Sequence, residues 1–163
     1  MSKIRELAGA ARAASHALAA LPGPARSALL RDLAAALRDP DTRAPVLAAN
    51  AADLAAAAEA HARGELDPAR YKRLSLDAAK LDGVAHGLEQ LSEAPELLGR
   101  PDLRRELDED LVLERVPCPL GVLGVVFEAR PDAVPQIAGL ALKSGNAAVL
   151  KGGREALQSN RAL

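Results

Sequence analysis

The segment 127–132 (FEARPD) holds a glutamate and an arginine whose position suits contact with a ligand. Glu128 and Arg130 follow a continuous apolar run that predicts a strand. In open α/β sheets, ligands bind beyond the carboxyl ends of the strands, where helix N-termini direct free N–H groups at anions. Two opposite charges at such a place indicate either a ligand contact or an ion pair, with each other or with a neighbouring loop. The residues alone leave both interpretations open.

A lysine, two glycines and an arginine follow the next predicted strand, as Lys151-Gly152-Gly153-Arg154. In dinucleotide-binding sheets this strand end lies near the adenosine ribose, where a basic residue suits a 2′-phosphate and a carboxylate favours the free 2′-hydroxyl. Glycine lets the backbone approach a ligand closely. Lys151 and Arg154 therefore favour NADP, whereas the alternative is a solvated strand end with a glycine turn. The first strand carries no GxGxxG fingerprint.

The other nucleophilic and metal-binding residue types show no pattern of a site. Cys118 is the single cysteine and lies between two prolines, with no activating base beside it. His16, His61 and His86 are too far apart in sequence for the spacing of a metal site. We therefore expect neither a catalytic residue nor a metal ligand in the 163 residues.

Helices must form the first part of the chain, because residues 1–95 are rich in alanine and leucine. Apolar residues in 4–21, among them Ile4, Leu7 and Leu18, recur mostly every three or four positions, which predicts one buried stripe. Proline, glycine and aspartate mark the ends of the segments. Further helices are expected from Pro24 to about Arg38, from about Thr42 to His61, after Asp67-Pro68, and from Asp77 to about Leu91.

The remainder of the chain predicts a connection and then an α/β unit. Residues 96–119 are a polar, turn-rich connection with a short arm strand near 111–116. Residues 120–163 predict the order β-α-β-α, the first half of a doubly wound nucleotide-binding sheet. The apolar run 120–127 is expected to be a parallel strand covered on both faces. Because the second strand would keep an open apolar edge, we expect a single domain that is truncated.

Composition excludes several classes of protein. The chain has 21 basic and 22 acidic residues, one Phe, one Tyr and no Trp. It therefore lacks the basic excess and the stacking platforms of a nucleic-acid binder. One cysteine excludes a disulfide framework and indicates a reducing compartment. No signal peptide or apolar segment of about 20 residues is apparent, so we expect a cytoplasmic protein without a membrane span.

Four stretches match motifs of one enzyme family: AANAADLA at 48–55, CPLGVLGVVFEARPD at 118–132, LKSGNAAVLKGGREA at 142–156 and SNRA at 159–162. They resemble the γ-glutamyl phosphate reductases, also called glutamate-5-semialdehyde dehydrogenases, of the aldehyde dehydrogenase superfamily. The resemblance implies an α/β fold, with an N-terminal helical layer followed by the first β-α-β-α half of an aldehyde-dehydrogenase-type nucleotide-binding sheet.

The resemblance also implies an activity and a set of site residues. The family reduces γ-glutamyl phosphate with NADPH to glutamate 5-semialdehyde and phosphate, in proline biosynthesis. Arg130 is our candidate for gripping the acyl phosphate, since a guanidinium fork matches phosphate geometry. By resemblance, the cofactor-binding residues are Val126, Phe127 and Glu128 on the nicotinamide side, and Lys151, Gly153 and Arg154 near the adenosine ribose and its 2′-phosphate.

Two residues depart from what a complete enzyme of this superfamily would need. The family's nucleophilic cysteine follows the nucleotide-binding domain, so Cys118 does not match it and the nucleophile is expected beyond residue 163. Ala129 stands where many aldehyde dehydrogenases carry an oxyanion-donating Asn. We therefore expect the isolated chain to have no reductase activity and at best weak affinity for NADPH.

Alternative functions and partners follow from the same residues. The chain could instead be a non-catalytic interaction module derived from this fold. A different aldehyde dehydrogenase branch, acting with NAD on a free aldehyde, is disfavoured by Lys151, Arg154 and Ala129. The superfamily usually forms homo-oligomers through sheet edges and an arm hairpin, and a glutamate kinase is a candidate partner that would hand over the acyl phosphate.

Overall fold

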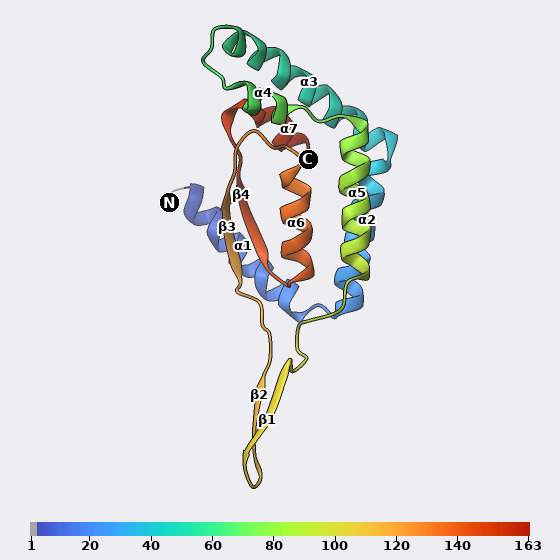
Figure 1. Ribbon diagram of the computed structural model, residues 1–163, viewed down its shortest axis with the longest axis vertical. Coiled ribbons are helices and arrows are strands. Elements are labelled where there is room, and N and C mark those ends of the chain that lie inside the picture. The colour runs from blue at the N-terminus through green and yellow to red at the C-terminus, as the bar shows by residue number, and fades with distance from the viewer. Residues whose placement is uncertain (1–2) are drawn as a thin grey trace.

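Helices followed by two small sheets make up the computed structural model, which describes residues 3–163 (Figure 1). No helix in this range is both long enough and apolar enough to cross a membrane. The elements are α1 (Lys3–Ala20), α2 (Gly23–Arg38), α3 (Pro40–Ala62), α4 (Pro68–Leu74), α5 (Ala78–Glu93), β1 (Leu103–Asp108), β2 (Leu111–Arg115), β3 (Val122–Val126), α6 (Ala133–Lys143), β4 (Ala147–Lys151), the 3₁₀ turn η1 (Arg154–Ala156) and α7 (Leu157–Ala162).

Three aspartates begin the helices α3, α4 and α5. Asp39 accepts a hydrogen bond from the backbone N–H of Thr42, Asp67 caps α4 and Asp77 caps α5. These side chains satisfy N–H groups that have no partner within the helix. The predicted helices are confirmed, except that α3 begins at Pro40 rather than Thr42, because Asp39 is its cap and proline suits the first turn.

The hydrophobic core lies mainly between α2 and α5. Its members are fully or almost fully buried, and Leu142 of α6 and Leu163 pack against it from the C-terminal part of the chain. The helical layer and the α/β unit therefore share one core. The buried members of the core are Leu30, Ala34, Leu37, Val46, Leu76, Leu81, Val84, Ala85 and Leu88.

Helix α1 differs from its prediction. Ser15 is its buried residue, whereas Ile4 is 78% exposed and Leu7 is 52% exposed. The helix crosses behind β3 and β4 and contacts both strands (Figure 1). The predicted stripe is wrong for the first turns of the helix, whereas Ala11 and Leu18 further along are half-buried because the contacts of α1 with the strands are made by its later turns.

Strands β1 and β2 form an antiparallel hairpin that projects away from the rest of the molecule (Figure 1). Every residue of both strands is exposed. Asp110 adopts a φ of 59° at the turn. The predicted arm strand is confirmed as β2, but its partner β1 lies in the segment interpreted as a connection, because 103–108 (LRRELD) lacks the apolar face that marks a half-buried strand.

Strands β3 and β4 pair in parallel, joined by α6, so the predicted β-α-β-α order is confirmed. The expectation that β3 is covered on both faces is wrong. Its exposure alternates along the strand, and Val126 is 74% exposed. Residues of β3 that face one side of the sheet are half-buried and those that face the other side are exposed, because β3 is an edge strand with a neighbouring strand on one side only.

Candidate functional site

The carboxyl ends of β3 and β4 bring the two predicted ligand-binding segments together. Val126 is the register partner of Lys151, the last pair of the ladder. Directly beyond it, the backbone N–H of Phe127 donates to the carbonyl of Lys151 over 3.1 Å. Residues predicted to contact the nicotinamide and the adenosine ribose therefore start from neighbouring strand ends, as expected for parallel strands.

Glu155 joins the two loops, although the sequence did not single it out. Its carboxylate accepts a hydrogen bond of 2.6 Å from the backbone N–H of Ala129, a buried residue with a φ of 49°. The same carboxylate covers Gly153, where a Cβ atom would lie 2.1 Å from Oε1. Glycine at 153 therefore leaves room for Glu155 to hold the loop after β3 against the loop after β4.

Glu128 forms an ion pair with Arg70 of α4. The Arg70 hydrogen bond and charge hold the pKa of Glu128 below its usual range, and the charge of Arg73 adds to this effect. Both partners are substantially exposed to solvent. Glu128 thus forms an ion pair, although its partner lies on α4 rather than at Arg130 or in a neighbouring loop, and its contact with the cofactor stays a prediction.

Arg130 contacts its own loop. Its guanidinium lies 3.1 Å from the carboxylate of Asp132, which also accepts a hydrogen bond of 3.3 Å from Gln136. About half of the Arg130 side chain is exposed, so the guanidinium keeps donors that face solvent. Arg130 therefore sits at the entrance to α6 with capacity to bind an anion.

Lys151 and Arg154 are exposed at the end of β4 and on η1. Within residues 3–163, neither forms an ion pair shorter than 4.0 Å. Gly152 between them is tightly enclosed, since a Cβ atom there would lie 2.1 Å from Asn160 Nδ2 and 3.3 Å from a ring carbon of Phe127. Among the described residues the two cations thus have no ion-pair partner, and the absence of a side chain at Gly152 leaves room for Asn160 and Phe127.

The helix after this loop is held by polar residues of α3 that sequence reasoning also missed. Asp53 and Asn50 are both buried and hydrogen-bond to the start of α7. The available signal was the motif AANAADLA, in which the two polar residues stand three positions apart, on one face of an otherwise apolar helix segment.

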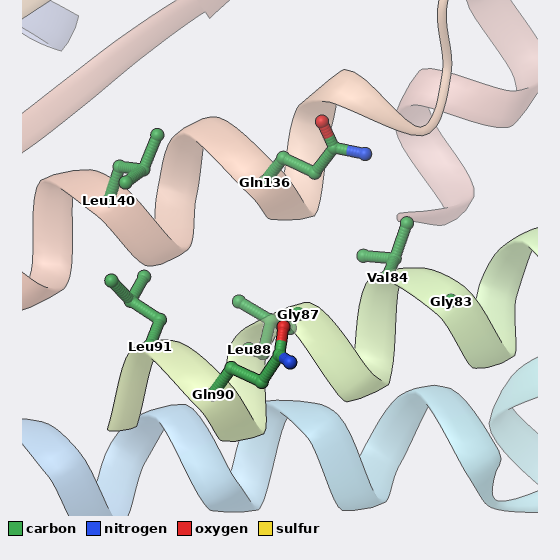
Figure 2. A pocket seen from close by; sticks show the side chains of 8 residues that line it. All are labelled: Gly83, Val84, Gly87, Leu88, Gln90, Leu91, Gln136 and Leu140. Carbon is green, nitrogen blue, oxygen red and sulfur yellow. The ribbon is translucent and has the colours of Figure 1, made fainter. Parts of the chain in front are cut away.

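The pocket drawn in Figure 2 lies elsewhere, between α5 and α6, with a volume of about 460 Å³. Leu91 and Leu140 approach each other from the two helices at one end, and Val84 and Gln136 flank the other (Figure 2). None of the predicted site residues lines it. Cys118 is exposed, and no group of three His, Cys, Asp or Glu residues among those described could hold a metal ion.

No protein-family model matches the chain. Its sequence is, however, similar to those of several known proteins, among them the following three. Gamma-glutamyl phosphate reductase from Synechococcus elongatus is 51% identical over 156 residues, which is 96% of this chain and 35% of that protein. The proteins of the same name from Cyanothece and Parasynechococcus marenigrum are 48% and 49% identical, over 98% and 99% of this chain. The chain spans about a third of the length of these relatives.

Two crystal structures have the same fold over almost the whole chain. Gamma-glutamyl phosphate reductase from Saccharomyces cerevisiae superposes with a TM-score of 0.88 at 35% identity, covering 99% of this chain and 40% of that protein. The protein of the same name from Thermotoga maritima gives 0.86 at 28% identity, with 99% and 37% covered. The chain is therefore a homologue of gamma-glutamyl phosphate reductase that covers about a third of that protein's length.

Proposed function

We propose that this chain supplies the adenosine-binding part of an NADPH-dependent reductase, which converts γ-glutamyl phosphate into glutamate 5-semialdehyde and phosphate in proline biosynthesis. One observation carries the proposal. Lys151 and Arg154 are exposed beyond the carboxyl end of a parallel strand and form no ion pair with any residue in 3–163, in a chain 51% identical over 156 residues to a gamma-glutamyl phosphate reductase. The proposal places the catalytic cysteine outside these 163 residues.

The residues present fit a phosphorylated dinucleotide. When bound, NADPH supplies the hydride of the reduction. Lys151 and Arg154 would bind the 2′-phosphate through charge-assisted hydrogen bonds, which are about twice as strong as neutral ones. Gly153 has no side chain, and the carboxylate that lies over it belongs to Glu155 and accepts the N–H of Ala129. The charge at the end of β4 thus favours NADPH over NADH.

The end of β3 would contact the nicotinamide half. Val126 and Phe127 present apolar surface beside Lys151, and Val126 is largely exposed. Apolar contact suits one face of a planar ring, while Glu128 stays ionised through Arg70. Arg130 would bind the acyl phosphate, with Asp132 orienting its guanidinium.

The hairpin β1–β2 supports a further part of the proposal, that the complete protein forms a homo-oligomer. Its strands expose several large apolar residues, and isolated two-stranded hairpins are marginally stable in water. Delivery of the acyl phosphate by a glutamate kinase, and a cytoplasmic location, remain predictions. The exposed apolar residues of the hairpin are Leu103, Leu107, Leu111, Val112 and Leu113.

A chimera tests the proposed function. The chain would replace the matched 156-residue segment in the Synechococcus elongatus reductase. We expect this chimera to reduce γ-glutamyl phosphate with NADPH, because the matched residues supply the cofactor site. The parent enzyme and the parent without the segment are the controls.

A correctly folded chimera without NADPH-dependent activity would contradict the proposal. It would favour the alternative that the chain is an interaction module. That alternative predicts that the 2′-phosphate does not strengthen the binding of a nucleotide. Circular dichroism and the molecular mass of the chimera in solution establish whether it has folded and assembled like the parent.

A further inference from the structure

A buried carboxylate on α3 caps the helix that follows the proposed phosphate site. Asp53 accepts hydrogen bonds from the backbone N–H groups of Gln158 and Ser159, over 3.1 and 2.8 Å, and from the Ser159 hydroxyl over 2.7 Å. Asp53 is 6% exposed and Ser159 is fully buried. Since α7 has six residues and no side-chain cap of its own, Asp53 supplies its N-terminal cap from a segment 105 residues earlier in the chain.

Asn50 completes this network one helical turn before Asp53. Its amide donates to the carbonyl of Leu74 and to the Ser159 hydroxyl, over 2.9 and 3.1 Å, and accepts from the N–H of Leu76 over 2.8 Å. The Ser159 hydroxyl thus donates to Asp53 and accepts from Asn50. With these contacts formed, the α3–α7 network (Asn50, Asp53 and Ser159) fixes both the position and the rotation of α7.

Helix α7 contacts the loop of the proposed phosphate site through Asn160, the residue that follows Ser159. The side chain of Asn160 packs on Gly152, where a Cβ atom would lie 2.1 Å from its Nδ2. At the start of the same segment, Ala156 is buried against Ala57 of α3 and Leu74 of α4. A rotation of α7 would therefore change the contact of Asn160 with Gly152, which lies between the two cations of the site, Lys151 and Arg154.

We infer that Asp53 is a positioning residue for recognition of the 2′-phosphate. It acts through Ser159 and Asn160 on the loop that carries Lys151 and Arg154. This inference rests on the proposed function, because it assigns Lys151 and Arg154 to the phosphate. It explains why the motifs at 48–55 and 159–162, which are far apart in sequence, occur together in this chain: they form the two sides of one buried contact.

The test compares two nucleotides that differ by the 2′-phosphate. Dissociation constants of the chain for 2′,5′-ADP and for 5′-AMP are measured by NMR titration, for the wild type and for Asp53→Asn and Ser159→Ala. We expect each variant to bind 2′,5′-ADP about tenfold more weakly, as for the loss of one charged hydrogen bond, with 5′-AMP unaffected. Ser159→Thr, which keeps the hydroxyl, should restore binding, and Asp32→Asn, an exposed carboxylate on α2, is the matched control.

Backbone amide shifts of the free variants provide a second readout. If Asp53 positions the loop, Ser159→Ala and Asp53→Asn move the amide signals of Lys151 to Arg154 while the signals of the α2–α5 core stay in place. Unchanged loop signals, or an equal loss of affinity for both nucleotides in a folded variant, would overturn the inference. If Asp53→Asn does not fold, the milder Ser159→Ala variant decides.

Failure of the proposed function gives a different result. In that case the wild-type chain binds 2′,5′-ADP no better than 5′-AMP, whatever the variants do. The positioning inference is then overturned as well, even where the loop signals move, since there is no phosphate to position.

Discussion

The helical layer and the two-stranded sheet β3–β4 are stabilised in different ways. Helices α2 and α5 bury leucines completely between them, with Leu30 and Leu81 at 0% exposure. The sheet, in contrast, exposes alternate residues of β3 and carries its charged residues at an open end. Burial of apolar side chains therefore stabilises the first region, whereas polar contacts from α3 and α4 reach the segments that follow the strands of the second region.

This difference separates the residues that maintain the fold from those that are available to a ligand. A buried leucine or amide loses its contacts when it is truncated, and the free energy of unfolding falls. An exposed cation without an ion pair makes few contacts in the folded chain. Its replacement should therefore change the affinity for a ligand and leave the free energy of unfolding nearly unchanged. Each of the following variants tests one side of this comparison.

Truncation in the helical core should have the largest effect. Leu30→Ala leaves a cavity between α2 and α5, and we expect a loss of about 2–5 kcal/mol in the free energy of unfolding. The neighbouring Leu29, which is 40% exposed, is the matched control, and Leu29→Ala should cost less than about 1 kcal/mol. Urea unfolding followed by circular dichroism measures both, and equal losses would show that the core is not where the structure places it.

Removal of the buried amide of Asn50 should have the next largest effect. Asn50→Ala leaves the N–H of Leu76 and the carbonyl of Leu74 without these partners, which costs about 1–3 kcal/mol. Gln90→Ala, an exposed amide on α5, should change stability by less than about 0.5 kcal/mol. A loss for Asn50→Ala as small as that of the control would contradict the α3–α7 network.

Replacement of Lys151 tests the open end of the sheet. We expect Lys151→Ala to leave the free energy of unfolding within about 0.5 kcal/mol of wild type, because the side chain is exposed. Its affinity for NADPH should fall about tenfold, with NADH binding unchanged. Lys72→Ala, an exposed lysine of α4, is the control for net charge. Calorimetric titration measures both affinities, and an equal loss for the two nucleotides would contradict the 2′-phosphate assignment.

The exposed ion pair Arg70–Glu128 should give the smallest effect. Because Arg70 lowers the pKa of Glu128 in the folded chain, the pair stabilises the fold at neutral pH, and this stabilisation is lost as the pH falls through that lowered pKa. Glu128→Gln should therefore lower the urea midpoint slightly at pH 7. In acid, the midpoints of the wild type and the variant should become equal. At about 1 M salt the difference should shrink through screening. A difference that persists in acid would show that another contact of Glu128 is responsible.

Local signals made most of the helices and the strands β3 and β4 predictable. Asp67 and Asp77 cap helices where the sequence indicated, and Gly64 and Gly145 adopt positive φ values just beyond helix ends. Such signals act within a few residues. The strand β1 was missed because it has no such local signal. Its pairing with β2 leaves both of its faces exposed, so no alternation of apolar and polar residues marks it.

The candidate site could be predicted only in part. Lys151 and Arg154 follow from their place after a strand, since the end of a parallel strand is visible in the sequence. The contacts of Glu155 with Ala129 and of Asp53 with Ser159 join residues 26 and 106 positions apart. No local pattern encodes such pairs. They depend on how α3 and η1 pack, which is decided by the tertiary structure.

The most direct test of the account is the affinity of the unmodified chain for NADPH and for NADH, measured side by side by calorimetry. The account predicts weak binding in which NADPH is favoured about tenfold or more, because Lys151 and Arg154 contact the 2′-phosphate. Equal affinities for the two nucleotides would contradict the assignment of these residues to the phosphate and with it the proposed role of the chain.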